Sequence, residues 1–269
     1  MKGLMFDLDG TLLLGDKALG GYQLLPDSIH VLTTLRDRGF PFVVLTNGSA
    51  YPPPEQAAKL RGLGLPVEDS QMLTPSSVAA DLLARRKVRS ALILGSRGVG
   101  YALEQAGVKA VFTGEPGAAE AEAVYVGWHP DCHMRDIEAA CHAIWNGAKL
   151  YVASDVPFFA TRQGRTMGYS YAIVGAIRRM TKVPMTLTGK PSLHALRYIA
   201  RKLHLKPAEI GVVGDDPAVE IEMAVKGGAT GFAVTTGVTD RAAWESQPAT
   251  RRPHHVLGSL REVLDFLPR

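Results

Sequence analysis

Short apolar runs alternate with helical segments along almost the whole chain, and this alternation constrains the fold more than any other feature. Seven runs are predicted strands: residues 3–6, 42–46, 91–95, 123–127, 149–154, 210–215 and 231–236. Eight segments are predicted helices: residues 27–39, 54–64, 75–87, 100–107, 134–147, 171–180, 191–204 and 218–228. Many of these segments end in Gly, which is favoured just after the last turn of a helix. The alternation predicts an α/β fold, with a Rossmann-like, doubly wound parallel sheet covered by helices on both faces.

Length and composition permit such a fold and argue against several classes of partner. With 269 residues, of which 46% are hydrophobic, the chain has material for one large domain or two smaller ones. No apolar run approaches the ~20 residues that a membrane-spanning helix needs. The net charge of +4 comes without a basic stripe, so we expect neither nucleic acid nor a membrane as a partner.

The cysteine content bears on the compartment. Cys132 and Cys141 are too few to form a framework of disulfides. Since no signal peptide is recognisable either, we expect the protein in the reducing cytoplasm.

Polar residues follow four of the predicted elements in an unusual pattern. Asp7 and Asp9 end the first strand, Thr46 and Asn47 end the second, and Asp215 and Asp216 end the sixth, while Lys190 precedes a helix. Ligands of open parallel sheets bind at the carboxyl ends of the strands. We therefore expect these side chains to meet at one edge of the sheet.

The acid pair is the first candidate for chemistry. Side chains alternate along a strand, so Asp7 and Asp9 would point to the same side if the strand continued. Two carboxylates that close repel each other, and Mg²⁺, which prefers carboxylates, waters and phosphate oxygens, would remove the conflict. An Asp-Gly turn beside an exposed acid is the alternative for this pair taken alone.

The other groups suit a phosphoryl ligand. Thr46 offers a hydroxyl, and the backbone of Asn47 and Gly48 offers N–H donors. Lys190 can neutralise phosphate charge, although the segment is no Walker loop because Pro191 follows the lysine. Asp215 supplies a second source of oxygen for a metal.

Four short motifs together resemble the haloacid dehalogenase superfamily of phosphotransferases: DLDGT (7–11), LTN (45–47), GKPS (189–192) and GDDPAVE (214–220). The long gap between the second and third motifs resembles subfamily IIA, the NagD-like and nitrophenylphosphatase-like proteins. Members of that subfamily carry an inserted α/β cap domain. The resemblance implies a core domain of residues 1–78 and 184–269 and a cap domain of residues 79–183.

The resemblance also implies an activity, a Mg²⁺-dependent phosphatase acting on a small organic phosphate monoester. Asp7 would attack phosphorus and become an aspartyl-phosphate, while Asp9 would protonate the leaving oxygen and then activate water. Asp7, the backbone carbonyl of Asp9 and Asp215 would hold Mg²⁺. Thr46 and Lys190, with nearby backbone N–H groups, would hold the transferring oxygens. The cap would act as a lid, and caps of this type often pair into a homodimer.

The fourth motif departs from the subfamily pattern. Val219 and Glu220 stand where a Thr-Asp pair is usual. Asp216 and Glu220 are therefore interpreted as supporting residues, for Lys190 or for a metal-bound water. The departure also keeps open a non-catalytic phospho-ligand-binding or regulatory protein on the same fold. A receiver domain is disfavoured because it would need only half this length.

Two features of the predicted cap remain open. The segment WHPDCH (128–133), with a second Cys-His pair at 141–142, suggests zinc, but its spacing matches no common closed site. A loop, with Cys141 as a small core residue, is the favoured interpretation. Several residues either face the substrate or serve packing and solvation: Trp128, Phe158, Phe159, Arg162 and Arg165.

Overall fold

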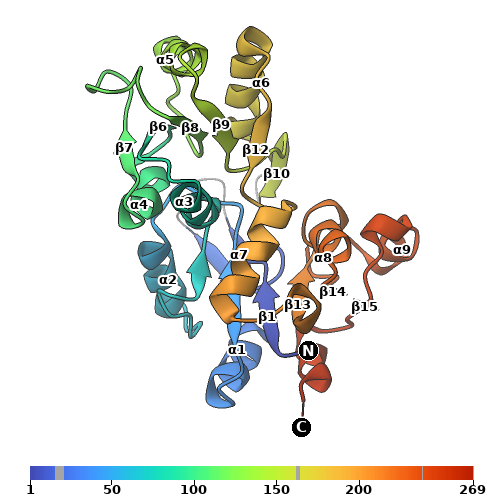
Figure 1. Cartoon of the computed structure of the whole chain (residues 1–269). Coiled ribbons are helices and arrows are strands. Elements are labelled where there is room, and N and C mark those ends of the chain that lie inside the picture. Colours follow the sequence, from blue (N-terminus) through green and yellow to red (C-terminus); the bar gives the residue numbers. More distant parts are fainter. Residues whose placement is uncertain (16–20, 162–163, 238, 269) are drawn as a thin grey trace.

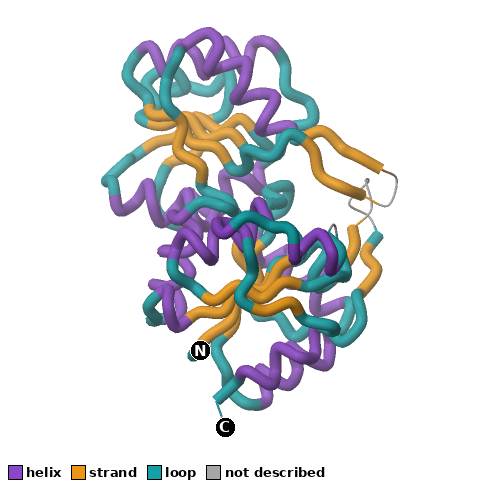
Figure 2. The backbone as a smooth tube through the Cα atoms, turned by 90° about the vertical axis from the view of Figure 1, so that its right-hand side faces the viewer, coloured by secondary structure: helices purple, strands orange, loops and turns teal. Residues whose placement is uncertain are grey.

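The computed structural model describes residues 1–15, 21–161, 164–237 and 239–268. The chain forms two lobes, each with a sheet covered by helices, and both termini lie at the far end of one lobe (Figure 2). That lobe, built on the larger sheet, is called the core lobe here, and the other is called the cap lobe. Among the described residues, no helix is both long and apolar enough to cross a membrane.

The core lobe is built on a six-stranded sheet in which all neighbours run parallel. In sheet order its strands are β15 (His255–Val256), β14 (Thr230–Ala233), β13 (Ile210–Gly214), β1 (Gly3–Phe6), β4 (Phe42–Leu45) and β5 (Met72–Leu73). The chain builds outward from β1 through β4 and later from β13 in the opposite direction. The neighbours β1 and β13 therefore form the topological switch point, where open α/β sheets bind ligands.

Helices cover both faces of this sheet. The helices α1 (Ser28–Asp37) and α2 (Pro53–Gly62) pack on one face, and α7 (Leu193–Leu203) and α8 (Glu222–Gly227) pack on the other. The alternation of side chains along a strand divides the core, since Leu4 and Phe6 face α1 while Met5 faces α7. Both clusters are fully buried, which fixes the positions of the strand ends.

The cap lobe is built on a second parallel sheet, seen in the upper half of Figure 1. Its order is β12 (Met185–Leu187), β9 (Lys149–Val152), β8 (Ala123–Val126), β6 (Ser90–Leu94) and β7 (Lys109–Val111). Its helices also pack on both faces. One face carries α5 (Met134–Trp145) and α6 (Tyr169–Thr181), and the other carries α3 (Pro75–Arg85) and α4 (Arg97–Gln105).

The helix α3 joins the two lobes. Its residue Val78 packs in the core lobe, whereas Ala79, Ala80 and Leu83 pack in the cap lobe. A β-hairpin adjoins each sheet: β2 (Leu13–Gly15) with β3 (Tyr22–Leu24), and β10 (Phe158–Thr161) with β11 (Gly164–Met167). The remaining elements are short: α9 (Arg241–Glu245), a π-helical turn (Pro217–Ile221) and 3₁₀ turns at Pro207–Glu209, Ala249–Arg251 and Leu260–Phe266.

The doubly wound α/β fold predicted from the sequence is confirmed, and all seven predicted strands are present. The predicted helix 218–228 begins instead as the π-helical turn, and only residues 222–227 are α-helical. The strands β5, β7, β12 and β15, each of two or three residues, were not predicted because so short a run shows no periodicity. The predicted domain boundary at residue 184 assigned β12 to the core, but β12 pairs with β9 in the cap lobe.

Candidate active site

The candidate site lies at the carboxyl ends of three neighbouring strands of the core lobe. Asp7 follows β1, Thr46 follows β4, and Asp215 follows β13. Lys190 comes from the turn between β12 and α7 and reaches the same place. Its ammonium contacts Asp7 Oδ1 and lies 2.8 Å from Glu220 Oε1. Residues more than 180 positions apart in the sequence are thus brought together at the switch point.

Four charged groups form what is called the charge cluster here: Asp7, Lys190, Asp215 and Glu220. Each of these residues is at most 5% exposed. Buried charges are tolerated only when they are paired and hydrogen-bonded, because the loss of water costs several kcal/mol per ion. Burial opposes the charge on Lys190, but the carboxylates of Asp7 and Glu220 more than offset it and raise its pKa above the usual value. Lys190 is therefore an ammonium.

The charge cluster carries more negative than positive charge. Burial raises the pKa of Glu220 well above its usual value, and the charges of Asp7 and Asp215 raise it further against the effect of Lys190. Carboxylate oxygens of Asp7, Asp215 and Glu220 lie within 4.8 Å of one another. Such a set of hard oxygen donors with excess negative charge fits a divalent cation such as Mg²⁺.

Two glycines allow the backbone to approach Asp215 closely. Gly10 has φ +91°, and a Cβ at this position would lie 2.3 Å from Asp215 Oδ2. A Cβ on Gly237 would lie 1.9 Å from the same oxygen. Any side chain at Gly10 or Gly237 would overlap with the Asp215 carboxylate, so both positions require glycine. The hydroxyl of Thr236 donates to Gly10 O over 2.8 Å and ties the exit of β14 to that turn.

Asn47 connects the turn after β4 to Lys190. Its side-chain amide donates to Lys190 O over 3.0 Å, and its Oδ1 accepts from Lys190 N over 2.8 Å. This reciprocal pair fixes the backbone that carries the buried ammonium. The Gly48 N–H donates to Thr46 Oγ1 over 2.9 Å, so this predicted phosphate donor has an internal partner in the structure.

Asp9 differs from the other acids because its side chain is exposed, on the wall of a cavity. The protein around the cavity nevertheless removes bulk water. This desolvation, with the nearby charge of Asp7 as the second cause, raises the pKa of Asp9 to about 6. The charge of Lys190 and a 3.3 Å hydrogen bond from Thr46 Oγ1 oppose the shift.

Asp216 and Thr11 support the cluster from outside it. The Asp216 carboxylate accepts from Ala218 N over 2.7 Å, while its own N–H donates to Glu220 Oε2 over 3.3 Å. Thr11 donates to Asp7 Oδ2 over 3.2 Å. The turn that holds Glu220 and the orientation of Asp7 thus both depend on local side-chain hydrogen bonds.

A cavity of about 750 Å³ lies over the charge cluster, between the two lobes. Its floor comes from the core lobe, and its roof includes Trp128, Phe158 and Tyr169 of the cap lobe. Trp128 packs edge-on against Tyr169 with ring centroids 4.8 Å apart, and the backbone N–H of Trp128 donates to Ser49 Oγ over 3.0 Å.

Sequence reasoning expected some of these lining residues and missed others. Trp128 and Phe158 line the cavity as one of the two interpretations predicted. Arg162 lies outside the described residues, as do the side chains of Phe159 and Arg165. Thr236 was missed, although it ends a predicted strand in the same way as Thr46.

Comparisons with known proteins identify the family. A model described as haloacid dehalogenase-like hydrolase matches residues 4–109, and one described as HAD-hydrolase-like matches residues 187–263. A D-glycerol 3-phosphate phosphatase of Mycobacterium tuberculosis is 30% identical over 97% of this chain and 70% of its own length. The chain belongs to the haloacid dehalogenase-like hydrolase family. The family and subfamily that the four motifs predicted are confirmed.

One further relative of this family and one solved structure match nearly the whole chain. The 5'-nucleotidase YutF of Bacillus subtilis is 28% identical over 99% of this chain and 98% of its own length. The crystal structure of glycerol phosphate phosphatase Rv1692 from Mycobacterium tuberculosis in complex with magnesium superposes with a TM-score of 0.83 at 27% identity, covering 97% of this chain and 76% of that one. The two matched family segments of this hydrolase flank residues 110–186, which hold most of the cap lobe.

The raised pKa of Asp9 predicts a pH-dependent cost to stability. Its folded pKa of about 6 lies above the ordinary value of 3.8, so the folded protein binds this proton more tightly than the unfolded chain, and the resulting stability is lost as pH rises through 6. With chelator present, Asp9→Asn should unfold at higher urea than wild type at pH 7.5, and this advantage should shrink at pH 4. Asp37→Asn, at an exposed position, is the control. An equal difference at both pH values would contradict the assignment.

Proposed function

We propose that this hydrolase is a Mg²⁺-dependent phosphatase that cleaves a small organic phosphate monoester through an aspartyl-phosphate on Asp7. One observation carries the proposal: the Asp7 carboxylate lies on the cavity floor, bonded to a buried ammonium and a hydroxyl, beside two further buried acids. The relatives named as phosphatases and a 5'-nucleotidase support the reaction class.

Asp7 is proposed as the nucleophile because its surroundings hold its carboxylate in one orientation on the cavity floor. Lys190 holds one carboxylate oxygen and Thr11 holds the other. An oxygen of the Asp7 carboxylate would attack the phosphorus of a substrate bound in the cavity. The bond from phosphorus to the leaving oxygen would break, and the leaving group would depart into the cavity. The reciprocal bonds from Asn47 keep Lys190 in position to offset charge on the transferring oxygens.

Asp9 is proposed as the general acid and base. A group with pKa near the working pH can give a proton to the leaving oxygen and then take one from the attacking water. The pKa of about 6 meets this requirement, and exposure to the cavity gives Asp9 access to both substrate and water. The Thr46 hydroxyl now donates to this carboxylate, and it would turn to a phosphoryl oxygen when substrate binds.

The phosphoryl oxygens are proposed to bind Thr46, Lys190 and the backbone N–H groups of Asn47 and Gly48. All four residues line the cavity. The Gly48 N–H now donates to Thr46 Oγ1 and would exchange that partner for a phosphoryl oxygen.

The metal site is proposed to consist of Asp7, Asp215 and the backbone carbonyl of Asp9. A relative has been crystallised with magnesium, which supports this cation. Bound Mg²⁺ would supply positive charge for the phosphoryl oxygens. Glu220 pairs with Lys190, and Asp216 holds the turn that carries Glu220, so both are proposed as supporting residues.

A non-catalytic phospho-ligand-binding or regulatory protein is the less well supported alternative. Its main argument was Val219 and Glu220 in place of Thr-Asp. The 2.8 Å ion pair between Glu220 and Lys190 supports a role for Glu220 within the site and so weakens that argument. The relatives compared above are enzymes and give this alternative no support.

We further propose a cytoplasmic protein with no nucleic acid or membrane partner, and a homodimer formed through the cap lobe. Two cap helices carry large apolar side chains with unusual exposure: Met134 at 77% and Trp145 at 59% on α5, and Met180 at 63% on α6. Burial of these side chains against a second copy would remove apolar surface from water.

The nucleophile assignment predicts that Asp7→Asn abolishes hydrolysis of p-nitrophenyl phosphate in the presence of Mg²⁺. The amide cannot attack phosphorus, and the expected loss is at least about 10³-fold in kcat. Release of p-nitrophenolate measures the rate, and Asp37→Asn, a surface Asp-to-Asn change, should retain full activity. Substantial turnover by the Asp7→Asn variant, purified and folded by circular dichroism, would remove Asp7 from this role.

The distinct roles of Asp215 and Glu220 predict different kinetic effects. Asp215→Asn should raise the Mg²⁺ concentration for half-maximal activity on the order of 10-fold or more, because a metal ligand is lost. Glu220→Gln should change that concentration less and lower kcat, because Lys190 loses an ion pair. Mg²⁺ titrations of both variants, after EDTA has abolished activity, give the comparison. A larger shift for Glu220→Gln would make Glu220 the metal ligand.

The proposed dimer predicts that the wild-type chain sediments as a dimer and that Trp145→Glu shifts it to the monomer. Ile29→Glu, at a 42% exposed position on the core lobe, should leave the dimer intact. Sedimentation equilibrium distinguishes these states. A wild-type chain that stays monomeric at tens of micromolar would refute the proposal.

A further inference from the structure

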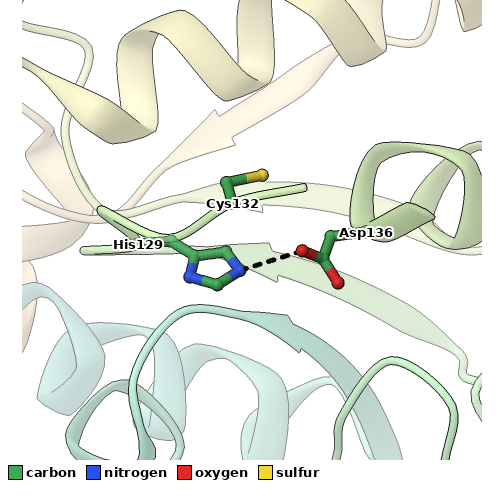
Figure 3. Close-up of side chains that lie close together, drawn as sticks. All are labelled: His129, Cys132 and Asp136. Atoms are coloured by element: carbon green, nitrogen blue, oxygen red, sulfur yellow. Dashed lines mark ion pairs between the residues drawn. The ribbon is translucent and has the colours of Figure 1, made fainter. Parts of the chain in front are cut away.

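A second group of metal-ligating side chains lies in the cap lobe, apart from the charge cluster. His129, Cys132 and Asp136 come from the loop between β8 and α5 and from the first turn of α5 (Figure 3). One ligand atom of each lies within 4.8 Å of the others, and His129 Nε2 lies 3.4 Å from Asp136 Oδ2. None of the three lines the cavity over Asp7.

We propose that His129, Cys132 and Asp136 bind a thiophilic divalent cation such as Zn²⁺, at a site separate from the magnesium site. This trio shares His129 and Cys132 with the segment WHPDCH that suggested zinc, but it uses Asp136 in place of the Cys-His pair at 141–142. Cys141 is buried in the cap core, as expected, and His133 is exposed. The imidazole comes instead from His129, three residues before Cys132.

The distances are close to those of a tetrahedral zinc site. With bonds of about 2.0 Å to nitrogen and oxygen, those two ligand atoms lie about 3.3 Å apart around Zn²⁺. The observed 3.4 Å between His129 Nε2 and Asp136 Oδ2 already has this value. With a bond of about 2.3 Å to sulfur, Sγ would lie about 3.5 Å from nitrogen. Because the ligand atoms lie within 4.8 Å of one another, the Cys132 sulfur would have to move inward by about 1.3 Å at most, which a side-chain rotation provides.

The surroundings hold the carboxylate and leave room for solvent. Asp136 Oδ2 accepts from His133 N over 2.7 Å, an orienting bond of the kind that metal ligands usually have. His129 and Cys132 are only partly buried, so a water can complete four-coordination. On binding, the sulfur–hydrogen bond of Cys132 breaks, a sulfur–zinc bond forms, and the proton passes to solvent.

The ligand chemistry separates the two sites of the chain. The charge cluster offers only carboxylate oxygens of buried acids, which suit Mg²⁺. The cap site offers sulfur and imidazole nitrogen, which favour zinc and cobalt over magnesium.

A cation at the cap site would also stiffen the roof of the cavity. His129 directly follows Trp128, whose backbone N–H donates to Ser49 Oγ over 3.0 Å and whose backbone carbonyl accepts from Ser96 N over 3.1 Å. A metal bond at His129 would add a fixed point next to this junction of the two lobes. The site is thus placed to influence how Trp128 meets a ligand.

Co²⁺ is the probe that tests the site, because a cobalt–thiolate bond gives a charge-transfer band in the near ultraviolet and tetrahedral cobalt gives strong visible bands. The full chain is titrated with Co²⁺ in excess Mg²⁺, which occupies the oxygen site. We expect both sets of bands in wild type. Cys132→Ser should lose the charge-transfer band, and His129→Gln should lose the tetrahedral bands or weaken binding at least 10-fold. Cys141→Ser and Asp215→Asn are the matched controls and should retain both.

Several outcomes would overturn the proposal. A wild-type chain without a thiolate band binds no cation through Cys132. A band that persists in Cys132→Ser, or that disappears in Cys141→Ser, assigns the thiolate elsewhere. Circular dichroism confirms that each variant is folded, and loss of the band only in Asp215→Asn would place the cation in the core lobe.

Discussion

The ion pairs of one buried lysine determine the rest of this site. Lys190 is almost inaccessible to water, and it retains its charge because Asp7 and Glu220 lie against its ammonium. The same ammonium offsets the repulsion between Asp7 and the other buried acids beside it. The neighbouring features serve this arrangement: Asn47 fixes the lysine backbone, and Gly10 gives Asp215 room beside the turn.

The two lobes contribute different kinds of side chain to the cavity wall. All the acids and the lysine of the cavity wall come from the core lobe, whereas the described roof residues of the cap lobe are aromatic, apolar or small and polar. The proposed phosphoryl contacts thus all lie on the core lobe, and the roof would contact whatever the phosphoryl group is attached to. The helix α3 packs in both lobes, and the Trp128 backbone donates a hydrogen bond to Ser49. Both contacts connect the roof of the cavity to its floor.

Much of this architecture could be predicted from the sequence because its signals are local. The apolar runs predicted the long strands, and the acids, hydroxyl and lysine at their ends predicted the convergence of Asp7, Thr46, Lys190 and Asp215. Contacts between residues far apart in the sequence could not be predicted in this way. No local pattern shows that Asn47 holds the Lys190 backbone 143 positions away or that β12 joins the cap sheet. The segment WHPDCH already held His129 and Cys132, but Asp136 was not linked to them because the loop bend that brings it close is defined only by the fold.

The central claim is that Asp7 receives the phosphoryl group while Lys190 and Thr46 grip its oxygens. A crystal structure of the protein grown with Mg²⁺ and beryllium fluoride, which mimics an acyl-phosphate, tests this most directly. The account predicts beryllium bonded to an oxygen of Asp7, with fluorines in contact with the Lys190 ammonium and the Thr46 hydroxyl and the cation on Asp215. Beryllium fluoride bound to another side chain, or lying in the cavity with Asp7 still paired only to Lys190 and Thr11, would contradict it.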